Sequence, residues 1–299
     1  MAYRNIFIAN NAELKAKNNQ LIISNGTEVS FPIEDIRSIL IENQSVTLTS
    51  HLISQLSDNN VCVLLCNKQH LPSAVLMPIN GFSRQSKRLE LQIKQTAPFK
   101  KRIWQSIVVA KITNQSECLR LIGLADSSKL TAISKSVQSG DTTNREGYAA
   151  NLYFKSLFGK GFKRDDEIPV NAALNYGYSI VRAYIARTLA VYGLEPSLGI
   201  HHKNEYNSFN LADDIIEPFR PVVDLYVKKF CFDPNNEFDS RDKAQLLMLL
   251  NAAIMSDGEK CTVATAVDRL VQSYVSAMEG GKYELKLPQL INTEFFKYD

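Results

Sequence analysis

The sequence has little that would anchor the protein in a membrane or cross-link it covalently. Its 299 residues include no apolar run close to the roughly 18 residues that a membrane-spanning helix needs. No apolar signal-peptide core follows Met1-Ala2-Tyr3-Arg4-Asn5. The five cysteines are odd in number and scattered, which excludes a regular disulfide framework. We therefore expect a cytoplasmic protein with reduced thiols.

The chain also has little excess charge of either sign, because its positive and negative residues nearly balance and the formal net charge is only +3. Its distribution is nevertheless uneven. Residues 78–140 contain 11 Lys or Arg and only 3 Asp or Glu, whereas the segments on either side are slightly acidic. A basic segment of this kind indicates binding to a polyanion such as DNA, and a solvated helical surface is the alternative.

The pattern of apolar residues changes along the chain. Residues 1–78 are typical of short strands, with a hairpin signal at Asn25-Gly26, and predict a small antiparallel β domain. Residues 79–86 are expected to form a linker. Residues 87–299 show helical spacing and predict a larger all-α domain, so the fold class is α+β. The expected helices begin in the linker and cover residues 84–96, 99–123, 127–138, 144–158, 170–192, 211–230, 240–256 and 262–279.

Two of the four histidines, His201 and His202, lie shortly before a helix start that is rich in carboxylates. In that helix Asp213 and Asp214 are four and three residues before Glu217, so all three can share a face. Imidazole and clustered carboxylates can bind a divalent cation that assists phosphate chemistry. The alternative is that the histidines pack and the aspartates complement the helix dipole.

Glu146 has two interpretations. Thr143 and Glu146 have the spacing of a capping box, in which Thr143 is the N-cap and Glu146 the third helical residue. The functional interpretation is that Glu146 supplies a metal ligand from a helix start. It requires a second set of ligands elsewhere in the chain.

At these residues the sequence resembles the CRISPR-associated spacer-acquisition integrase and endonuclease family, and most closely its members from type II systems. The resemblance covers essentially the whole chain, including the order of a β domain, a linker and a helical domain. Four motifs carry it, in the family's order: Asn144-Arg145-Glu146-Gly147, Asn175-Tyr176-Gly177-Tyr178, Gly199-Ile200-His201-His202 and Asp214-Ile215-Ile216-Glu217-Pro218-Phe219-Arg220-Pro221.

The resemblance implies that Glu146, His202 and Glu217 are the catalytic residues and ligands of Mg²⁺ or Mn²⁺. Some members have aspartate where this chain has Glu217, which keeps the oxygen ligand on a longer side chain. His201, Asp213 and Asp214 are expected to support the site. The DNA-binding residues are expected to be Arg84, Lys87, Arg88, Lys94, Lys100, Lys101, Arg102, Arg145 and Arg220. Stacking of Trp104 or Tyr148 on bases is a further option, with core packing as the alternative.

The implied activity is insertion of short double-stranded DNA into a CRISPR array. The 3′-OH of the fragment attacks a phosphodiester at one end of a repeat, and a second site joins the other strand. Two attacks at a fixed distance require two sites, which indicates an oligomer. By resemblance, the β domain forms a homodimer, and two dimers flank a dimer of a small ferredoxin-like partner in a heterohexamer. The RNA-guided nuclease of a type II system is a further expected partner.

Two other functions remain open from the residues alone. The helical domain could be a non-catalytic DNA-binding scaffold, whose acidic residues only cap helices. It could also be a metal-dependent phosphohydrolase that acts on nucleotides. That enzyme would need a small enclosed pocket and no long basic surface, and the basic segment argues against it.

Overall fold

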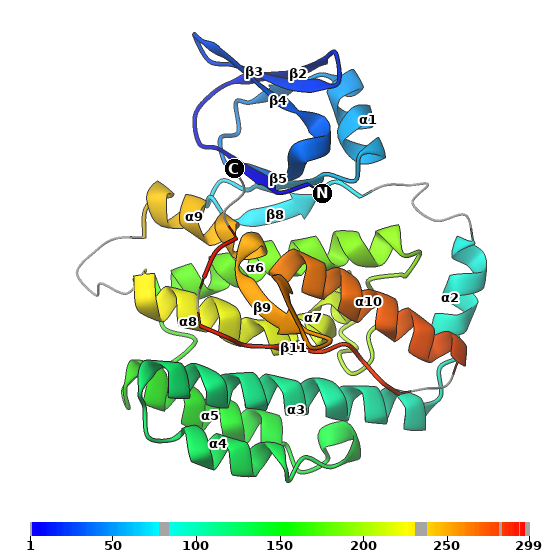
Figure 1. Ribbon diagram of the computed structural model, residues 1–299, viewed down its shortest axis with the longest axis vertical. Coiled ribbons are helices and arrows are strands. Elements are labelled where there is room, and N and C mark those ends of the chain that lie inside the picture. The colour runs from blue at the N-terminus through cyan, green and yellow to red at the C-terminus, as the bar shows by residue number, and fades with distance from the viewer. Residues whose placement is uncertain (1, 78–83, 231–237, 281–282, 293, 297–299) are drawn as a thin grey trace.

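The protein is described by a computed structural model that covers residues 2–77, 84–230, 238–280, 283–292 and 294–296 (Figure 1). Strands come first and form one end of the molecule, and a larger helical region follows. This arrangement confirms the predicted α+β class. None of the helices in these ranges is both long and apolar enough to cross a membrane. The expected linker, residues 79–86, lies largely outside the described residues, and helix α2 (Gln85–Ile93) already begins within it.

Two four-stranded sheets form the N-terminal region. One has the order β1-β5-β7-β8 and the other β4-β3-β2-β6. The bounds are β1 Arg4–Ile8, β2 Glu13–Lys17, β3 Gln20–Ser24, β4 Glu28–Pro32, β5 Ile36–Ile41, β6 Thr47–Leu48, β7 Cys62–Cys66 and β8 Pro72–Val75. Helix α1 (Ser50–Asp58) and the short 3-10 helix η1 (Ile33–Asp35) complete it.

The expectation of an antiparallel domain is only partly right. The hairpin at Asn25-Gly26 is confirmed, because β3 and β4 pair antiparallel from Ser24 and Glu28 outward. Strands β1, β5 and β7, however, pair in parallel. All six residues of β5 are buried. A strand that is buried on both faces has no alternation of apolar and polar residues. The sequence pattern therefore did not indicate that this strand pairs in parallel.

Helices make up most of the chain after residue 84 (Figure 1). Their apolar residues, together with a few from the first sheet, form the larger of two hydrophobic clusters. The bounds are α3 Ala97–Ile122, α4 Ser127–Ser134, η2 Ser139–Asp141, α5 Arg145–Phe158, α6 Pro169–Val191, α7 Asn210–Ile216, η3 Glu217–Phe219, α8 Arg220–Phe230, α9 Ser240–Leu247, η4 Met248–Asn251 and α10 Val263–Gly280.

The helical region is not entirely helical, which corrects the all-α expectation. The predicted helix over 240–256 ends early, and strands β9 (Ala253–Ser256), β10 (Glu259–Thr262) and β11 (Pro288–Gln289) form a small sheet. The cause is Asp257-Gly258, where both residues have positive φ, 55° and 76°. Such a dipeptide is a strong signal for a two-residue hairpin, and it outweighs the helical spacing around it.

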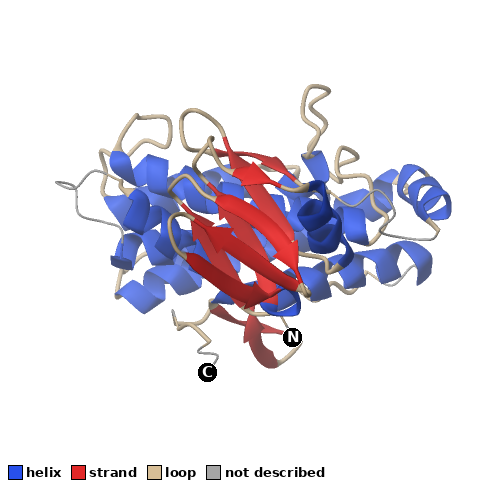
Figure 2. Cartoon of the chain, turned by 90° about the horizontal axis from the view of Figure 1, so that it is seen from above, coloured by secondary structure: helices blue, strands red, loops and turns tan. Residues whose placement is uncertain are grey.

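The two regions are joined by buried polar contacts as well as apolar ones. Arg37 on β5 donates to the side chain of Asn251 at 2.6 Å and to the carbonyl of Leu250 at 3.3 Å. Asn251 donates in turn to the carbonyl of Tyr3. In the view from above, the strands lie across the middle of the helices (Figure 2). The N-terminal region thus packs directly against the helical region.

Candidate active site

Helix α3 is the element along which the site is built. Lys100, in its first turn, donates to the carbonyl of Gly199 at 3.3 Å. Trp104 is buried and stacks on the ring of His201, with 4.2 Å between ring centroids. Lys111 lies two turns further on. Spacings of four and seven residues put the three side chains on one side of the helix.

The turn that carries the two histidines is held by Asp214 of α7. The Asp214 carboxylate is completely buried and accepts the backbone N–H groups of Ile200, His201 and His202, at 2.5, 3.0 and 3.2 Å. A Cβ on Gly199 would lie 2.2 Å from a backbone oxygen, so only glycine fits there. Asp214 therefore fixes the backbone of this turn.

The ring of His202 is also oriented by Asp214. Its Nδ1 lies 2.7 Å from Asp214 Oδ1, and the side chain is 42 % exposed. This hydrogen bond to the carboxylate raises the pKa of His202 above its ordinary value, against a smaller opposing effect of burial. A histidine that uses Nδ1 in this way keeps Nε2 for a ligand, as metal-binding histidines commonly do.

Glu146 lies in the first turn of α5, but not in a capping box. The N-cap is Asn144, in a left-handed conformation, and its side chain accepts the N–H of Gly147 at 3.2 Å. Asp141 accepts the N–H groups of Arg145 and Glu146 at 2.8 and 2.9 Å. The predicted N-cap at Thr143 is therefore wrong. The side chain of Glu146 is one-quarter exposed and not engaged in capping.

Glu217 opens the 3-10 turn η3 between α7 and α8, and its side chain is almost completely buried. Its Oε1 accepts a hydrogen bond from Arg220 Nε at 2.9 Å. Burial by itself raises the pKa of this carboxyl, but Arg220 and Lys111 outweigh burial and lower the pKa to about 2. Glu217 is therefore a carboxylate at neutral pH.

Lys111 is the residue that sequence reasoning missed. Its side chain is 10 % exposed, and its ammonium lies 2.6 Å from Glu146 Oε1 and also contacts Glu217 Oε2. Burial lowers the pKa of Lys111, but the two carboxylates raise it by more, so the group is charged. A lysine among the buried apolar residues of a helix was a signal that could have been noticed.

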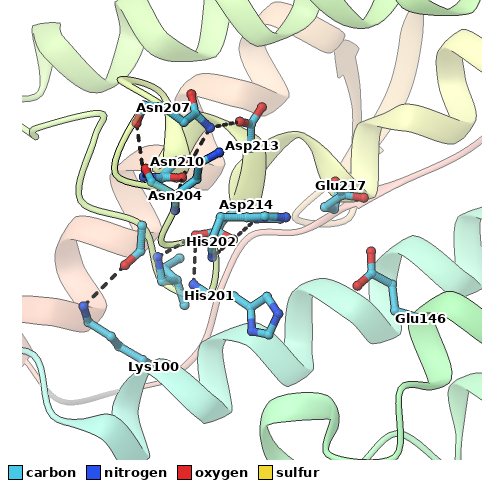
Figure 3. Close-up of polar contacts among 12 residues, drawn as sticks. Lys100, Glu146, His201, His202, Asn204, Asn207, Asn210, Asp213, Asp214 and Glu217 are labelled. Carbon is cyan, nitrogen blue, oxygen red and sulfur yellow. Dashed lines mark hydrogen bonds and ion pairs between the residues drawn. The ribbon is translucent and has the colours of Figure 1, made fainter.

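The structure thus brings together two of the three expected metal ligands. Glu146 and Glu217, 71 positions apart in the sequence, share one ammonium group, and the two histidines lie beside them (Figure 3). Within the part of the chain that is described, however, no three His, Cys, Asp or Glu side chains are close enough to form a metal cluster. His202 is near enough to feel the charge of Glu217, which contributes to raising its pKa.

Asp213 does not face this carboxylate pair. It accepts hydrogen bonds from Arg182, at 2.5 and 2.9 Å, and from Asn207 at 2.6 Å. These contacts attach α7 to α6 and fix the segment that follows the histidines. Asp213 therefore has a structural role in this arrangement.

The expected DNA-binding cations divide into three groups by exposure and pairing. Arg88 is buried and pairs with Glu279 at 3.3 Å, and Arg220 pairs with Glu217, so neither presents a simple exposed charge. Five are exposed, on α2, at its two ends or on the second turn of α3: Arg84, Lys87, Lys94, Lys101 and Arg102. Figure 1 shows that these two helices adjoin at the same end of the molecule. Lys100 and Arg145 are partly buried.

The two aromatic residues considered for base stacking also differ. Trp104 is 1 % exposed and packs in the core against His201, as the alternative interpretation held. Tyr148, on α5, is 60 % exposed. It lies two residues after Glu146 on the same helix, and this spacing puts the two side chains on different faces.

A third buried carboxylate, that of Asp224, lies near Arg220. Asp224 accepts a hydrogen bond from the hydroxyl of Tyr153 at 3.0 Å and one from the hydroxyl of Tyr178. The guanidinium of Arg220 lies over the Tyr178 ring, 4.6 Å from its centroid. Burial raises the pKa of Asp224 to about 6, despite the two hydroxyl donors. Tyr178, from the second of the four motifs, thus contacts both Asp224 and Arg220, and Arg220 in turn pairs with Glu217.

Comparison with known proteins assigns this chain, with its β region and its helical region, to a class of CRISPR-associated proteins. The family model of "CRISPR associated protein Cas1" matches residues 6–252. The chain is 38% identical to the "CRISPR-associated endonuclease Cas1" of Neisseria meningitidis serogroup C (strain 8013), over 100% of both chains. The protein therefore belongs to the Cas1 family.

Solved structures support the same fold. A "Casposase bound to integration product" matches with a TM-score of 0.76 and 20% identity, over 96% of this chain and 93% of that chain. The "Cas6-RT-Cas1--Cas2 complex" matches with a TM-score of 0.68 and 16% identity, over 95% of this chain and 36% of that chain. At these identities the likeness concerns the fold alone.

Proposed function

We propose that this protein is a divalent-metal-dependent DNA endonuclease and strand transferase. It joins the 3′-OH ends of short double-stranded DNA to the ends of a CRISPR repeat, and so inserts new spacers. The observation that carries the proposal is the convergence of Glu146 and Glu217 on one positive charge, with the half-exposed ring of His202 beside them.

The donor set fits Mg²⁺ or Mn²⁺. Both are hard cations that prefer carboxylate oxygens and accept an imidazole. The ammonium of Lys111 already takes the place of a cation between the two glutamates. Glu217 Oε2 is buried, and its partner among the described residues is the charged ammonium of Lys111, so this oxygen already binds a cation. Glu146, Glu217 and His202 would hold the metal.

The chemistry follows from these positions. A divalent cation would neutralise charge on the scissile phosphate and lower the pKa of the attacking hydroxyl. Asp214 keeps the His202 ring oriented through Nδ1. Arg220 keeps Glu217 ionised and in place. The exposed cations of α2 and α3, including Lys87 and Lys101, would bind DNA phosphates.

The proposal extends to an assembly. Joining both strands of a fragment needs two sites, so we propose a homodimer formed by the N-terminal region. Val29, Ile53 and Leu65 are exposed apolar side chains of this region and are available for such a contact. A structural relative is described in complex with Cas2, which supports a partner of that type in a heterohexamer. The RNA-guided nuclease of a type II system is a further proposed partner.

The test is a joining assay with the purified protein. A labelled duplex with 3′-OH ends should become joined to a plasmid carrying a repeat only when Mg²⁺ or Mn²⁺ is present. Glu146→Gln and His202→Ala should each reduce the rate by about a thousandfold, since each removes a metal ligand. Lys260→Met, which removes a surface charge far along the chain, should leave the rate unchanged.

One observation favours a second function, that of a non-catalytic DNA-binding scaffold. The ion pairs of Lys111 neutralise Glu146 and Glu217 without any metal. A scaffold would bind DNA equally well in EDTA and in Mn²⁺, and would show no joining. Undiminished joining by Glu146→Gln or His202→Ala would instead exclude the assigned site.

A further inference from the structure

The ammonium of Lys111 lies where the proposed metal would bind. It contacts one carboxylate oxygen of Glu146, at 2.6 Å, and one of Glu217. These glutamates come from different helices, α5 and η3, and Lys111 comes from a third, α3. A lysine that bridges two proposed metal ligands cannot keep both contacts while a cation takes the same oxygens.

The charges around this point are balanced without a metal. Two carboxylates, Glu146 and Glu217, face two cations, Lys111 and Arg220. A dication that enters therefore meets a neutral cluster instead of a negative one. Removing the charge of Lys111 would leave one net negative charge, which attracts a dication at close range.

The position of Lys111 is fixed by its surroundings. Its side chain is 10 % exposed. The next buried polar residue on the same helix, Asn114, is fixed by hydrogen bonds. Asn114 donates to the carbonyls of Pro218 and Pro288 at 2.8 and 3.0 Å and accepts from the N–H of Leu290 at 3.0 Å. Helix α3 is thus attached to η3, one residue away from Glu217, and the lysine cannot move far with its helix.

We propose that Lys111 is a built-in competitor of the catalytic metal, a positioning residue that holds Glu146 and Glu217 together in the metal-free protein and must withdraw when a divalent cation binds. It sets the affinity of the site and keeps the two carboxylates from repelling one another. This inference rests on the proposed metal dependence, and it assigns to Lys111 a role that opposes metal binding.

Calorimetric titration of the metal-depleted, full-length protein with MnCl₂ tests the inference. Lys111→Met should bind Mn²⁺ about tenfold more tightly than the wild type, because the competing charge is gone. Lys111→Arg, which keeps the charge, should resemble the wild type. The matched control is Lys260→Met, which breaks an exposed lysine–glutamate pair with Glu294 and should leave the affinity unchanged. A merely structural role could weaken binding but would not tighten it.

Several results would overturn the inference. Equal or weaker binding by Lys111→Met would exclude competition and leave the proposed function intact. Absence of Mn²⁺ binding by every variant and by the wild type would overturn the metal dependence together with this inference. Should Lys111→Met fail to fold, wild-type crystals grown with MnCl₂ decide. The Lys111 Nζ should then no longer bridge the two carboxylates, and a bound Mn²⁺ with Nζ still bonded to both would contradict competition.

Discussion

The two halves of the site are built differently. The carboxylate half, Glu146 and Glu217, is held by ion pairs with Lys111 and Arg220. The histidine half, His202 and the turn before it, is held by hydrogen bonds to one buried carboxylate, Asp214. Glu217 is almost completely buried, whereas the His202 side chain is 42 % exposed.

The two halves differ in whether the contacts that stabilise them use the atoms that a metal would bind. In the carboxylate half the cations that stabilise the fold also occupy the oxygens that a metal would use. In the histidine half the stabilising contacts go to backbone N–H groups and to Nδ1, and Nε2 remains for a ligand. Stability and function therefore conflict in the first half and are compatible in the second.

The largest effect on stability is expected from the carboxylate half. Glu217→Gln removes the anion that pairs with Arg220 and Lys111, and should lower the free energy of unfolding by about 3 kcal/mol. His202→Ala should cost less than about 1 kcal/mol, because the ring is half-exposed and Asp214 keeps three backbone donors. Denaturant unfolding of both variants checks this, with loss of joining in each. Equal destabilisation would remove the contrast between the halves.

An effect of comparable size concerns pH and Asp224, the buried acid near Arg220. The pKa of Asp224 is about 6 in the folded protein against an ordinary 3.8, so folding favours its protonated form. The stabilisation from protonated Asp224 is complete below about pH 4 and is lost as the pH rises through about 6. The free energy of unfolding should fall by up to about 3 kcal/mol over this range. Asp224→Asn should remove this dependence.

Unfolding of wild type and Asp224→Asn at pH 4 to 7.5 measures the difference. The exposed carboxylate variant Asp58→Asn serves as the control and should follow the wild type across the range. A constant difference between wild type and Asp224→Asn would mean that Asp224 is ionised throughout.

The smallest effect is expected outside both halves, on the basic surface. Replacing Lys87, Lys101 and Arg102 by Ala should lower the salt dependence of DNA binding, with a change in slope of up to about 3. Replacing Lys15, Lys129 and Lys260 removes the same charge elsewhere and is the control. Binding isotherms at several salt concentrations measure the slope. Equal slopes for the two triple variants would place the DNA on another surface.

The sequence predicted most of the fold because its signals were local. Helix α10 has a strong apolar periodicity, and the hairpin at Asn25-Gly26 has its own turn residues. The parallel pairing of β5 was missed, since a strand buried on both faces does not reveal its neighbours. The β9–β10 hairpin was missed because helical spacing was given more weight than Asp257-Gly258.

For the site, motifs predicted the residues but not their partners. Resemblance indicated Glu146, His202 and Glu217, and the roles proposed for them remain predictions. Lys111 belongs to none of the four motifs, and its contacts join segments more than 30 and 100 positions away. Only the folded chain shows that its ammonium lies between the two glutamates. Likewise, the burial of Arg88 depends on Glu279, far along the chain.

The most direct test of the account is whether one cation is bound by both halves of the site. Electron spin echo spectroscopy of Mn²⁺ bound to the protein detects coordinated imidazole nitrogen. The account predicts a nitrogen coupling that is lost in His202→Ala and kept in His201→Ala, with Mn²⁺ binding itself weakened in Glu217→Gln. A bound Mn²⁺ with no such coupling, or with one that survives His202→Ala, would contradict it.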